Sequence, residues 1–320
     1  MRKLILGAIT LIIAATSSVL AADKLKVAIP QKGFWDSSWV EFAEAAGFFK
    51  EAGLEVEIFW TEGGAQTVAT VVSGSVDVAL SNGILAAINA YVKGGPDTPY
   101  RIISAQMTGA NELFWYVKAD SPIKSLRDAD DKTAAFSAPG SSSNLILLSL
   151  LKQAGSKAKP TATGGLPGTL TSTMTGQIDI GWAVPPFALR ELQDNKIRII
   201  ARAREATELK DLTLRVNITT AETLRTKRAA ITRLMQVYDK AITWAYANPK
   251  SIDYFAEGAK VPRDIAKQAV DEFFPRESLQ IGEIRGLDMT LRDALQYKFT
   301  TSQLTPKDVE PLFDIVYKPS

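Results

Sequence analysis

The chain contains neither histidine nor cysteine among its 320 residues. Their absence excludes a Ser-His-Asp triad, a Cys-His dyad, zinc held by histidine and every cluster held by cysteine. Carboxylate pairs, Ser-Lys dyads and Mg²⁺ sites stay possible in principle. We nonetheless expect no catalytic residue, no metal ion and no cofactor, and we do not expect an enzyme. Because no disulfide bond can form either, a large hydrophobic core has to stabilise the fold.

The chain also lacks an excess of charge of either sign. It has 37 basic and 35 acidic residues, and two of the basic ones, Arg2 and Lys3, precede the apolar run 4–15 and the small residues that end at Ala21. This order is typical of a secretory signal, so we expect residues 1–21 to be removed near Ala21 and the protein to be periplasmic. The remaining balance favours no nucleic-acid partner, and we expect a monomer.

Apolar residues alternate in short segments that are separated by segments with helical periodicity. This order predicts a β-α-β-α-β run, which is typical of a parallel sheet with helices packed on it. The predicted strands span 25–29, 56–60 and 76–80, and the predicted helices span 39–51 and 65–73. Residues 81–83 are expected to form a loop after the third strand.

One phrase of this pattern occurs twice. Residues 74–79, Gly-Ser-Val-Asp-Val-Ala, are echoed by residues 176–181, Gly-Gln-Ile-Asp-Ile-Gly, at a separation of 176 − 74 = 102 residues. A repeat of this length predicts two similar α/β lobes. We expect lobe 1 to comprise 22–112 and 216–320 and lobe 2 to comprise 113–215, with the mainly helical residues beyond 220 packed on lobe 1.

A turn rich in serine separates a predicted strand at 133–137 from a predicted helix at 145–151. Its residues Ser141, Ser142 and Ser143 place hydroxyl and free backbone N–H groups at a helix N-terminus, where an anion can bind without a charged side chain. Serine is also a preferred N-cap, so the turn could serve only to begin the helix. The sequence leaves both interpretations open.

Open parallel sheets bind ligands beyond the carboxyl ends of their strands, so the other loops at these ends supply further candidates. They offer one cation, several aromatic rings and small or polar groups. Lys32 could equally be a solvated surface charge, and each aromatic residue could belong to the core. These candidate ligand-binding residues are Lys32, Phe34, Trp35, Gly64, Ala65, Ser81, Asn82, Trp182 and Phe187.

Five phrases of the chain resemble, in order, those of a known family. They are Gly47-Phe-Phe-Lys-Glu-Ala-Gly-Leu-Glu-Val56, Ser73-Gly-Ser-Val-Asp-Val78, Ser121-Pro-Ile-Lys-Ser-Leu126, Gly140-Ser-Ser-Ser-Asn144 and Gly176-Gln-Ile-Asp-Ile-Gly-Trp182. The family is the NMT1/THI5-like group of substrate-binding proteins, which serve ABC importers for sulfonates, taurine, nitrate and thiamine pyrimidine precursors. The resemblance covers residues from about 24 to about 205.

The resemblance implies a fold and a function. The fold is the two-lobed periplasmic binding protein fold of type II, in which each lobe is a mainly parallel sheet flanked by helices. The function is delivery of a small, anionic or pyrimidine-like ligand to a permease in the inner membrane by hinge closure. Related pyrimidine synthases use a histidine and a cysteine-rich segment, which this chain lacks. A ligand-sensing partner of a membrane receptor would share the same site and stays open as an alternative.

Overall fold

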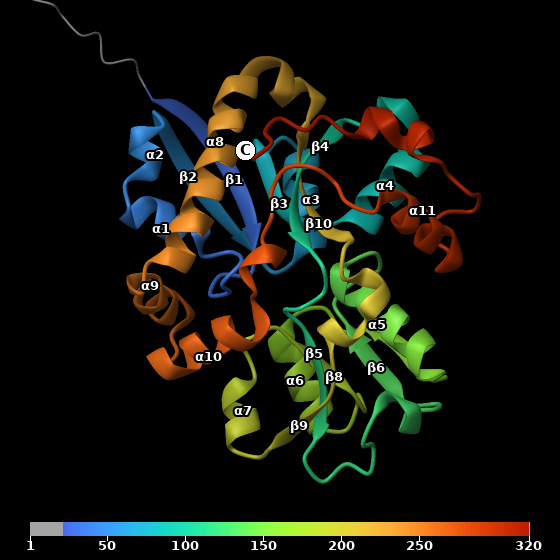
Figure 1. Cartoon of the computed structure of the whole chain (residues 1–320). Coiled ribbons are helices and arrows are strands. Elements are labelled where there is room, and N and C mark those ends of the chain that lie inside the picture. Colours follow the sequence, from blue (N-terminus) through green and yellow to red (C-terminus); the bar gives the residue numbers. More distant parts are fainter. Residues whose placement is uncertain (1–21, 320) are drawn as a thin grey trace, which may run out of the picture.

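The computed structural model describes residues 22–319. The predicted signal segment, 1–21, lies outside these residues. Two α/β lobes are stacked one on the other, with the amino-terminal strands in the first and the central part of the chain in the second (Figure 1). In the described part of the chain, no helix is both long enough and apolar enough to cross a membrane.

The first sheet has five strands in the order β2-β1-β3-β10-β4. β1 pairs in parallel with β2 and β3, whereas β10 is antiparallel to both of its neighbours, so four of the five strands run in one direction. The strands are β1 (Asp23–Pro30), β2 (Leu54–Thr61), β3 (Val78–Gly83), β4 (Tyr100–Thr108) and β10 (Thr213–Thr220).

Helices cover both faces of this sheet, and the buried residues of its central strands show why. Val27 and Ile29 belong to one hydrophobic cluster with the helices α1 (Trp39–Ala45) and α8 (Ala221–Ala247). Between them, Ala28 points to the opposite side and joins the cluster of α3 (Gly64–Val72) and α4 (Ile84–Gly94). A strand that is buried on both faces reads as a continuous apolar run, as β1 does at its carboxyl end.

The second sheet repeats this strand order. β6 (Thr133–Phe136) pairs in parallel with β7 (Lys159–Ala162), and β5 (Phe114–Lys118) lies antiparallel between β8 (Gly181–Ala183) and β9 (Ile197–Arg202). A parallel bridge between Ala134 and Ile180 joins the two groups into the order β7-β6-β8-β5-β9. The sheet is flanked by α5 (Ser142–Ala154), α6 (Leu166–Met174) and α7 (Leu189–Gln193).

Equivalent contacts in the two lobes are also separated by 102 residues in the sequence. In lobe 1, the hydroxyls of Thr61 and Thr67 lie 2.6 Å apart, and Thr67 also donates to the carbonyl of Gly63. In lobe 2, the hydroxyls of Thr163 and Thr169 lie 2.6 Å apart, and Thr169 donates to Gly165. Each pair joins a strand end to the following helix, so the predicted repeat of two α/β lobes is confirmed.

The carboxyl-terminal segment packs on lobe 1, as predicted, but it also contacts lobe 2. In this segment α8 lies against α1, and α11 (Leu287–Gln296) lies against α4. The helix α10 (Arg263–Phe273), which follows α9 (Lys250–Ala259), packs instead against α7 of lobe 2. The ring of Phe273 lies 5.6 Å from that of Phe114.

Local details differ from the sequence-based expectation in two places. The predicted helix 39–51 is divided into α1 and α2 (Phe48–Glu51), because Gly47 takes a positive φ of 74° between them. The predicted loop 81–83 is the end of β3, and α4 begins at once at Ile84. The predicted lobe boundaries at 112/113 and 215/216 stay a prediction; β10 crosses the second of them.

Candidate functional site

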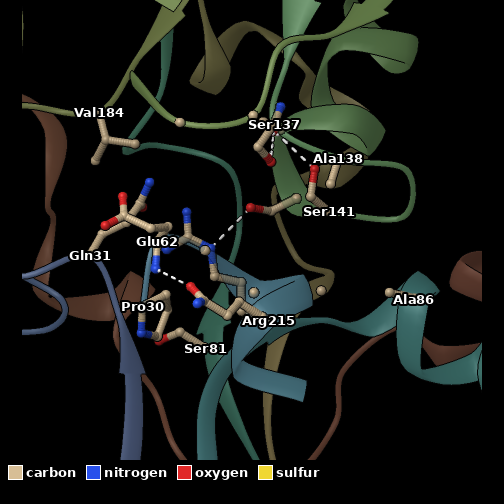
Figure 2. Close-up of a pocket in the computed structure, with 18 of the residues that line it drawn as sticks. Pro30, Gln31, Glu62, Ser81, Ala86, Ser137, Ala138, Ser141, Val184 and Arg215 are labelled. Carbon is tan, nitrogen blue, oxygen red and sulfur yellow. Dashed lines mark hydrogen bonds between the residues drawn. The ribbon is translucent and has the colours of Figure 1, made fainter. Parts of the chain in front are cut away.

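A cavity of about 280 Å³ lies between the two lobes, beyond the carboxyl ends of their strands (Figure 2). Its volume is just below the lower limit for pockets that hold drug-sized molecules, so it suits a small ligand. The lobe 1 wall includes Pro30, Gln31, Glu62, Gly63, Gly64, Gln66, Ser81, Gly83, Ala86 and Arg215. The lobe 2 wall includes Ser137, Ala138, Pro139, Ser141, Ser142, Ser143, Gly164, Gly165, Trp182 and Val184.

Four helices begin at this cavity, two from each lobe. The N-cap residues of α3, α4, α5 and α6 are Gly63, Gly83, Ser141 and Gly165, and all four line the cavity. At the three glycines no side chain caps the helix. Because the first N–H groups of a helix lack intrahelical acceptors and carry positive potential, four such ends form an environment suited to negative charge.

Two of the glycines also let the lobes approach closely. A Cβ atom at Gly83 would lie 2.4 Å from the carbonyl oxygen of Gly140, in the serine-rich turn of lobe 2. A Cβ at Gly140 would lie 2.9 Å from the backbone nitrogen of Ala86, and Gly140 has a positive φ of 78°. The turn that begins α5 therefore packs directly on the start of α4, with backbone against backbone.

The serine-rich turn caps a helix and also presents free backbone N–H groups. The Ser141 hydroxyl accepts from the backbone N–H of Asn144, and the Ser143 hydroxyl accepts from the N–H of Ser137. These two hydroxyls are thus engaged within the turn. Among the described residues, the backbone N–H groups of Ser142 and Ser143 have no acceptor, so they stay free at the edge of the cavity.

An ion cluster around Arg215 connects the lobes behind the cavity. The guanidinium donates to Asp36 at 2.7 Å, to Glu112 at 2.6 Å and, through Nε, to the hydroxyl of Ser142 at 3.0 Å. Arg215 and the carboxylates are nearly or fully buried. Burial raises the pKa of Glu112, while Arg215 acts in the opposite direction. The charge of Arg215 is consequently satisfied by protein groups.

Two polar groups of the cavity wall have no hydrogen-bond partner among the described residues. They are the hydroxyl of Ser81 in lobe 1 and the indole nitrogen of Trp182 in lobe 2, and both side chains are more than nine-tenths buried. Ser81 has a positive φ of 56°, and its backbone N–H donates to the side chain of Asn217. Buried polar groups are rarely left unpaired, and their place in the cavity wall makes both groups candidates for contact with a ligand.

The structure brings half of the residues predicted from the sequence to this cavity. Gly64 and Ser81 line its lobe 1 wall, and the three serines and Trp182 line its lobe 2 wall. Asn82 lies just behind the wall, fully buried, with its amide donating to the carbonyls of Ala79 and Val216. Ala65 follows Gly64 in the first turn of α3.

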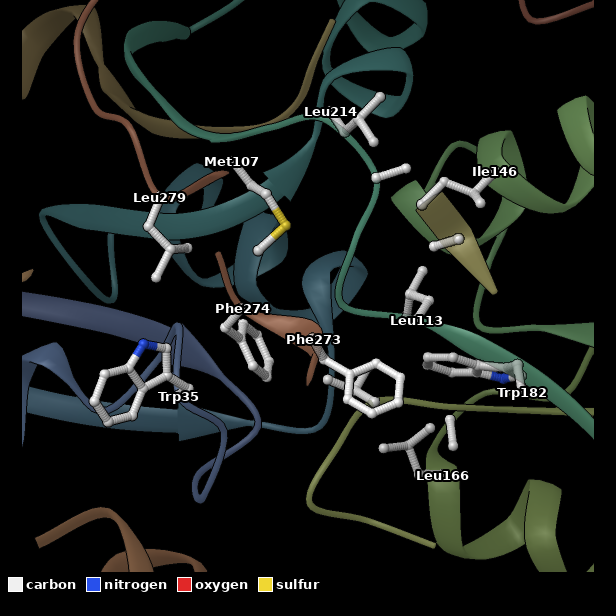
Figure 3. Packing of buried hydrophobic residues seen from close by; sticks show 14 of the residues in the cluster. Trp35, Met107, Leu113, Ile146, Leu166, Trp182, Leu214, Phe273, Phe274 and Leu279 are labelled. Carbon is white, nitrogen blue, oxygen red and sulfur yellow. The ribbon is translucent and has the colours of Figure 1, made fainter. Parts of the chain in front are cut away.

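The remaining predicted residues lie away from the cavity. The ammonium of Lys32 is 3.7 Å from Glu41 and 5.7 Å from the ring centre of Trp60, which makes it a partly exposed surface charge. Trp35 belongs to the buried hydrophobic cluster (Figure 3), and its ring centre lies 5.4 Å from those of Tyr246 and Phe255. Phe34 and Phe187 pack against the same core. None of these four residues lines the cavity.

Five polar residues of the cavity wall are absent from the candidates predicted from the sequence: Gln31, Glu62, Gln66, Ser137 and Arg215. Gln31 and Glu62 lie in the same strand-end loops as the candidates Lys32 and Gly64, so their position in the sequence was a sufficient signal. Arg215 lies inside β10, the strand that returns from lobe 2. A single charged residue in a largely buried strand is a signal that a buried ion pair is present, but its partners are 179 and 103 residues away.

No group of three or more acidic side chains that could hold a metal ion occurs in residues 22–319. With histidine and cysteine absent from the sequence, the cavity wall offers backbone N–H groups, hydroxyls, amides, one indole, the carboxylate of Glu62 and the guanidinium of Arg215. Such groups bind and orient a ligand.

Known structures share this fold at low sequence identity. The periplasmic aliphatic sulphonate binding protein SsuA from Escherichia coli aligns with a TM-score of 0.71 and 17% identity, covering 93% of this chain and 92% of that one. The alkanesulfonate-binding protein SsuA from Xanthomonas axonopodis pv. citri, bound to MOPS, gives 0.76 and 14%, covering 91% and 98%. The periplasmic nitrate-binding protein NrtA from Synechocystis PCC 6803 gives 0.68 and 14%, covering 91% and 85%.

These similarities confirm the predicted fold. Comparison of the sequence with curated proteins gave no significant match. The family model described as "NMT1/THI5 like" matches residues 39–252, which is more than half of the chain and includes most of the cavity wall. The chain therefore belongs to the NMT1/THI5-like family.

Proposed function

We propose that this protein is an extracytoplasmic solute-binding protein that delivers a small organic anion to an ABC importer. The convergence of four helix N-termini on one cavity between two lobes is the observation that carries the proposal. The solved sulfonate-binding and nitrate-binding proteins of the same fold support it. Location in the periplasm, a permease as the partner and a monomeric state are parts of the same proposal.

The binding free energies expected for this cavity suit a receptor of moderate affinity. One helix N-terminus contributes at most about 2 kcal/mol to the binding of an anion in a partly buried site, whereas micromolar affinity requires about 8 kcal/mol. Helix ends from both lobes, together with the unpaired groups of Ser81 and Trp182, can supply much of this only when the lobes close on the ligand. We therefore propose hinge closure as the signal to the permease.

Binding without chemistry is the expected behaviour. Among the described residues of the cavity wall, no hydroxyl is hydrogen-bonded to a carboxylate or a lysine, and Arg215 donates to Asp36, Glu112 and Ser142. A bound ligand should accordingly be recovered unchanged. Turnover of a bound ligand, detected by mass spectrometry, would instead favour a secreted enzyme related to the pyrimidine synthases.

A thermal-shift panel tests the proposed function. Residues 22–320 are mixed with small sulfonates, carboxylates, nitrate, phosphate and amino-pyrimidines, and the hits are measured by isothermal titration calorimetry. A ligand at about 100 times its Kd should add about 2.7 kcal/mol of stability. Absence of a shift with every compound would contradict a receptor for this range of ligands.

A further inference from the structure

We propose that α10 is a latch between the lobes, which favours their closed arrangement through contacts outside the ligand cavity. Glu272 and Phe273, at the end of α10, make these contacts with lobe 2, and neither residue belongs to the described cavity wall. The inference goes beyond the proposed function, because it concerns the equilibrium between open and closed lobes in the protein without a ligand.

α10 is anchored to lobe 1 at its carboxyl end. The carbonyl of Phe274, the first residue after the helix, accepts from the hydroxyl of Tyr246 on α8 at 2.7 Å. Figure 3 shows the ring of Phe274 on the side of Trp35, which belongs to lobe 1. Pro262 and Pro275 flank the helix, and because proline does not continue a helix, α10 is a short rod of its own.

The last residue of α10, Phe273, contacts the other lobe. Its ring centre lies 5.6 Å from that of Phe114 on β5, and the guanidinium carbon of Arg202 on β9 lies 4.6 Å from the same centre. Figure 3 shows Phe273 on the side of Leu113 and Trp182, and both of these residues line the cavity. Phe273 is 1% exposed, so two adjacent residues join the cores of both lobes.

Polar contacts lie beside the buried ring of Phe273. Arg202 donates to Glu272 at 3.3 Å, and Gln193 on α7 donates to Gln268, one turn earlier in α10, at 3.3 Å. The ion pair is partly exposed and contributes less to the contact than the burial of an aromatic ring. It holds Arg202 over the ring, so the polar and apolar contacts form together.

The ring of Phe273 is buried only while lobe 2 lies against α10. Because α10 is fixed to lobe 1 next to the Tyr246 bond, separation of the lobes draws Phe273 out of lobe 2 and exposes it to water. Exposure of apolar surface is unfavourable, so the latch shifts the ligand-free protein towards the closed arrangement. The apparent Kd is the intrinsic Kd divided by the closed fraction, so the latch strengthens the binding of every ligand by the same factor.

Distances between the lobes of the ligand-free protein test the latch. The sequence contains no cysteine, so Ser75→Cys in lobe 1 and Gln177→Cys in lobe 2 introduce the only thiols, at exposed positions that the repeat relates. Nitroxide labels on both thiols report the distribution of distances by pulsed electron paramagnetic resonance. We expect a closed population in the labelled protein, and a ratio of closed to open that falls about tenfold in Phe273→Ala, which corresponds to about 1.4 kcal/mol.

The matched control is Phe42→Ala, because the ring of Phe42 is equally buried but packs within lobe 1. It should leave the distribution of distances unchanged. If Phe273→Ala does not fold, Glu272→Lys takes its place, since a second positive charge opposite Arg202 should shift the distribution in the same direction.

Three results overturn the inference: no closed population in the labelled protein, an unchanged distribution in the latch variant that folds, or an equal shift in Phe42→Ala. None of these measurements involves a ligand, so each of them leaves the proposed function intact.

Discussion

At the scale of single residues, Arg215 joins three distant parts of the chain. It lies on β10, yet it contacts the loop after β1, the segment that enters lobe 2 and the first residue of α5. Its partners Asp36 and Glu112 are 3% and 0% exposed, so neither carboxylate can turn to water instead. The cluster therefore links the two places where the chain passes from one lobe to the other.

Replacement of Arg215 should therefore be costly. In Arg215→Met two buried carboxylates lose their counterion, and breaking a buried pair in this way costs about 3–5 kcal/mol. We expect the free energy of unfolding in urea to fall by about 3 kcal/mol. Arg225→Met, which removes an exposed arginine paired with Glu222, should change it by less than about 1 kcal/mol.

The double variant Arg215→Met/Glu112→Gln refines this prediction. With one of the two carboxylates neutralised, part of the lost stability should return. If the single variant loses less than about 1 kcal/mol, the cluster does not stabilise the fold and its role has to be sought in ligand binding alone.

At the scale of elements, the starts of α4 and α5 determine how closely the lobes meet. Gly83 has an ordinary φ of −62°, so alanine fits its backbone without strain, but the added Cβ would lie 2.4 Å from the carbonyl oxygen of Gly140. The clash is between lobes and not within one.

Gly83→Ala should thus hold the lobes apart and leave each lobe folded. We expect ligand affinity to fall by tenfold or more in calorimetry, with a larger radius of gyration in solution X-ray scattering. Gly168→Ala in α6 is the matched control, because a Cβ there meets no atom within 4 Å. Unchanged affinity in Gly83→Ala would show that the lobes bind the ligand without this contact.

At the scale of the whole molecule, the sequence predicts the architecture better than the site. The repeat of 102 residues and the alternation in β1 depend on local rules of burial and helix ends, and the structure confirms both. Whether an aromatic side chain near a strand end enters a cleft depends on which distant helix covers it. Trp35 is covered by residues of α8 and α9, more than 200 residues away, so its place in the core could not be predicted locally.

The same reasoning applies to charged residues. From the sequence alone Lys32 is a candidate ligand for an anion, but the fold places Glu41 beside it. The position of Arg215 within a strand indicates an ion pair, but the sequence does not reveal that Asp36 and Glu112 are its partners. Residues that act through backbone N–H groups, such as Ser142 and Ser143, were found because a helix start is a local property. Side chains whose partners lie in the other lobe cannot be found from a local property of the sequence.

The packing of the carboxyl-terminal segment makes the stability of the whole molecule depend on pH. Asp293 on α11 is half-buried beside lobe 2, where burial and then the nearby Glu208 raise its pKa to about 6. A carboxyl group with a raised pKa favours the fold while it is protonated, below its ordinary value of 3.8, and this contribution is lost as the pH rises through about 6.

Asp293→Asn should remove this dependence, since the amide is neutral throughout. At pH 7.5 we expect the variant to be more stable than the wild type by roughly 1 kcal/mol, a value that allows for solvent screening of a half-buried group. At pH 4 the two should unfold at the same urea concentration. Asp288 is an exposed aspartate on the same helix and serves as the control. The difference in stability between Asp288→Asn and the wild type should be the same at pH 7.5 and at pH 4. A wild type that gains stability between pH 5 and pH 7 relative to Asp293→Asn would instead mean that the ionised carboxylate has a favourable partner.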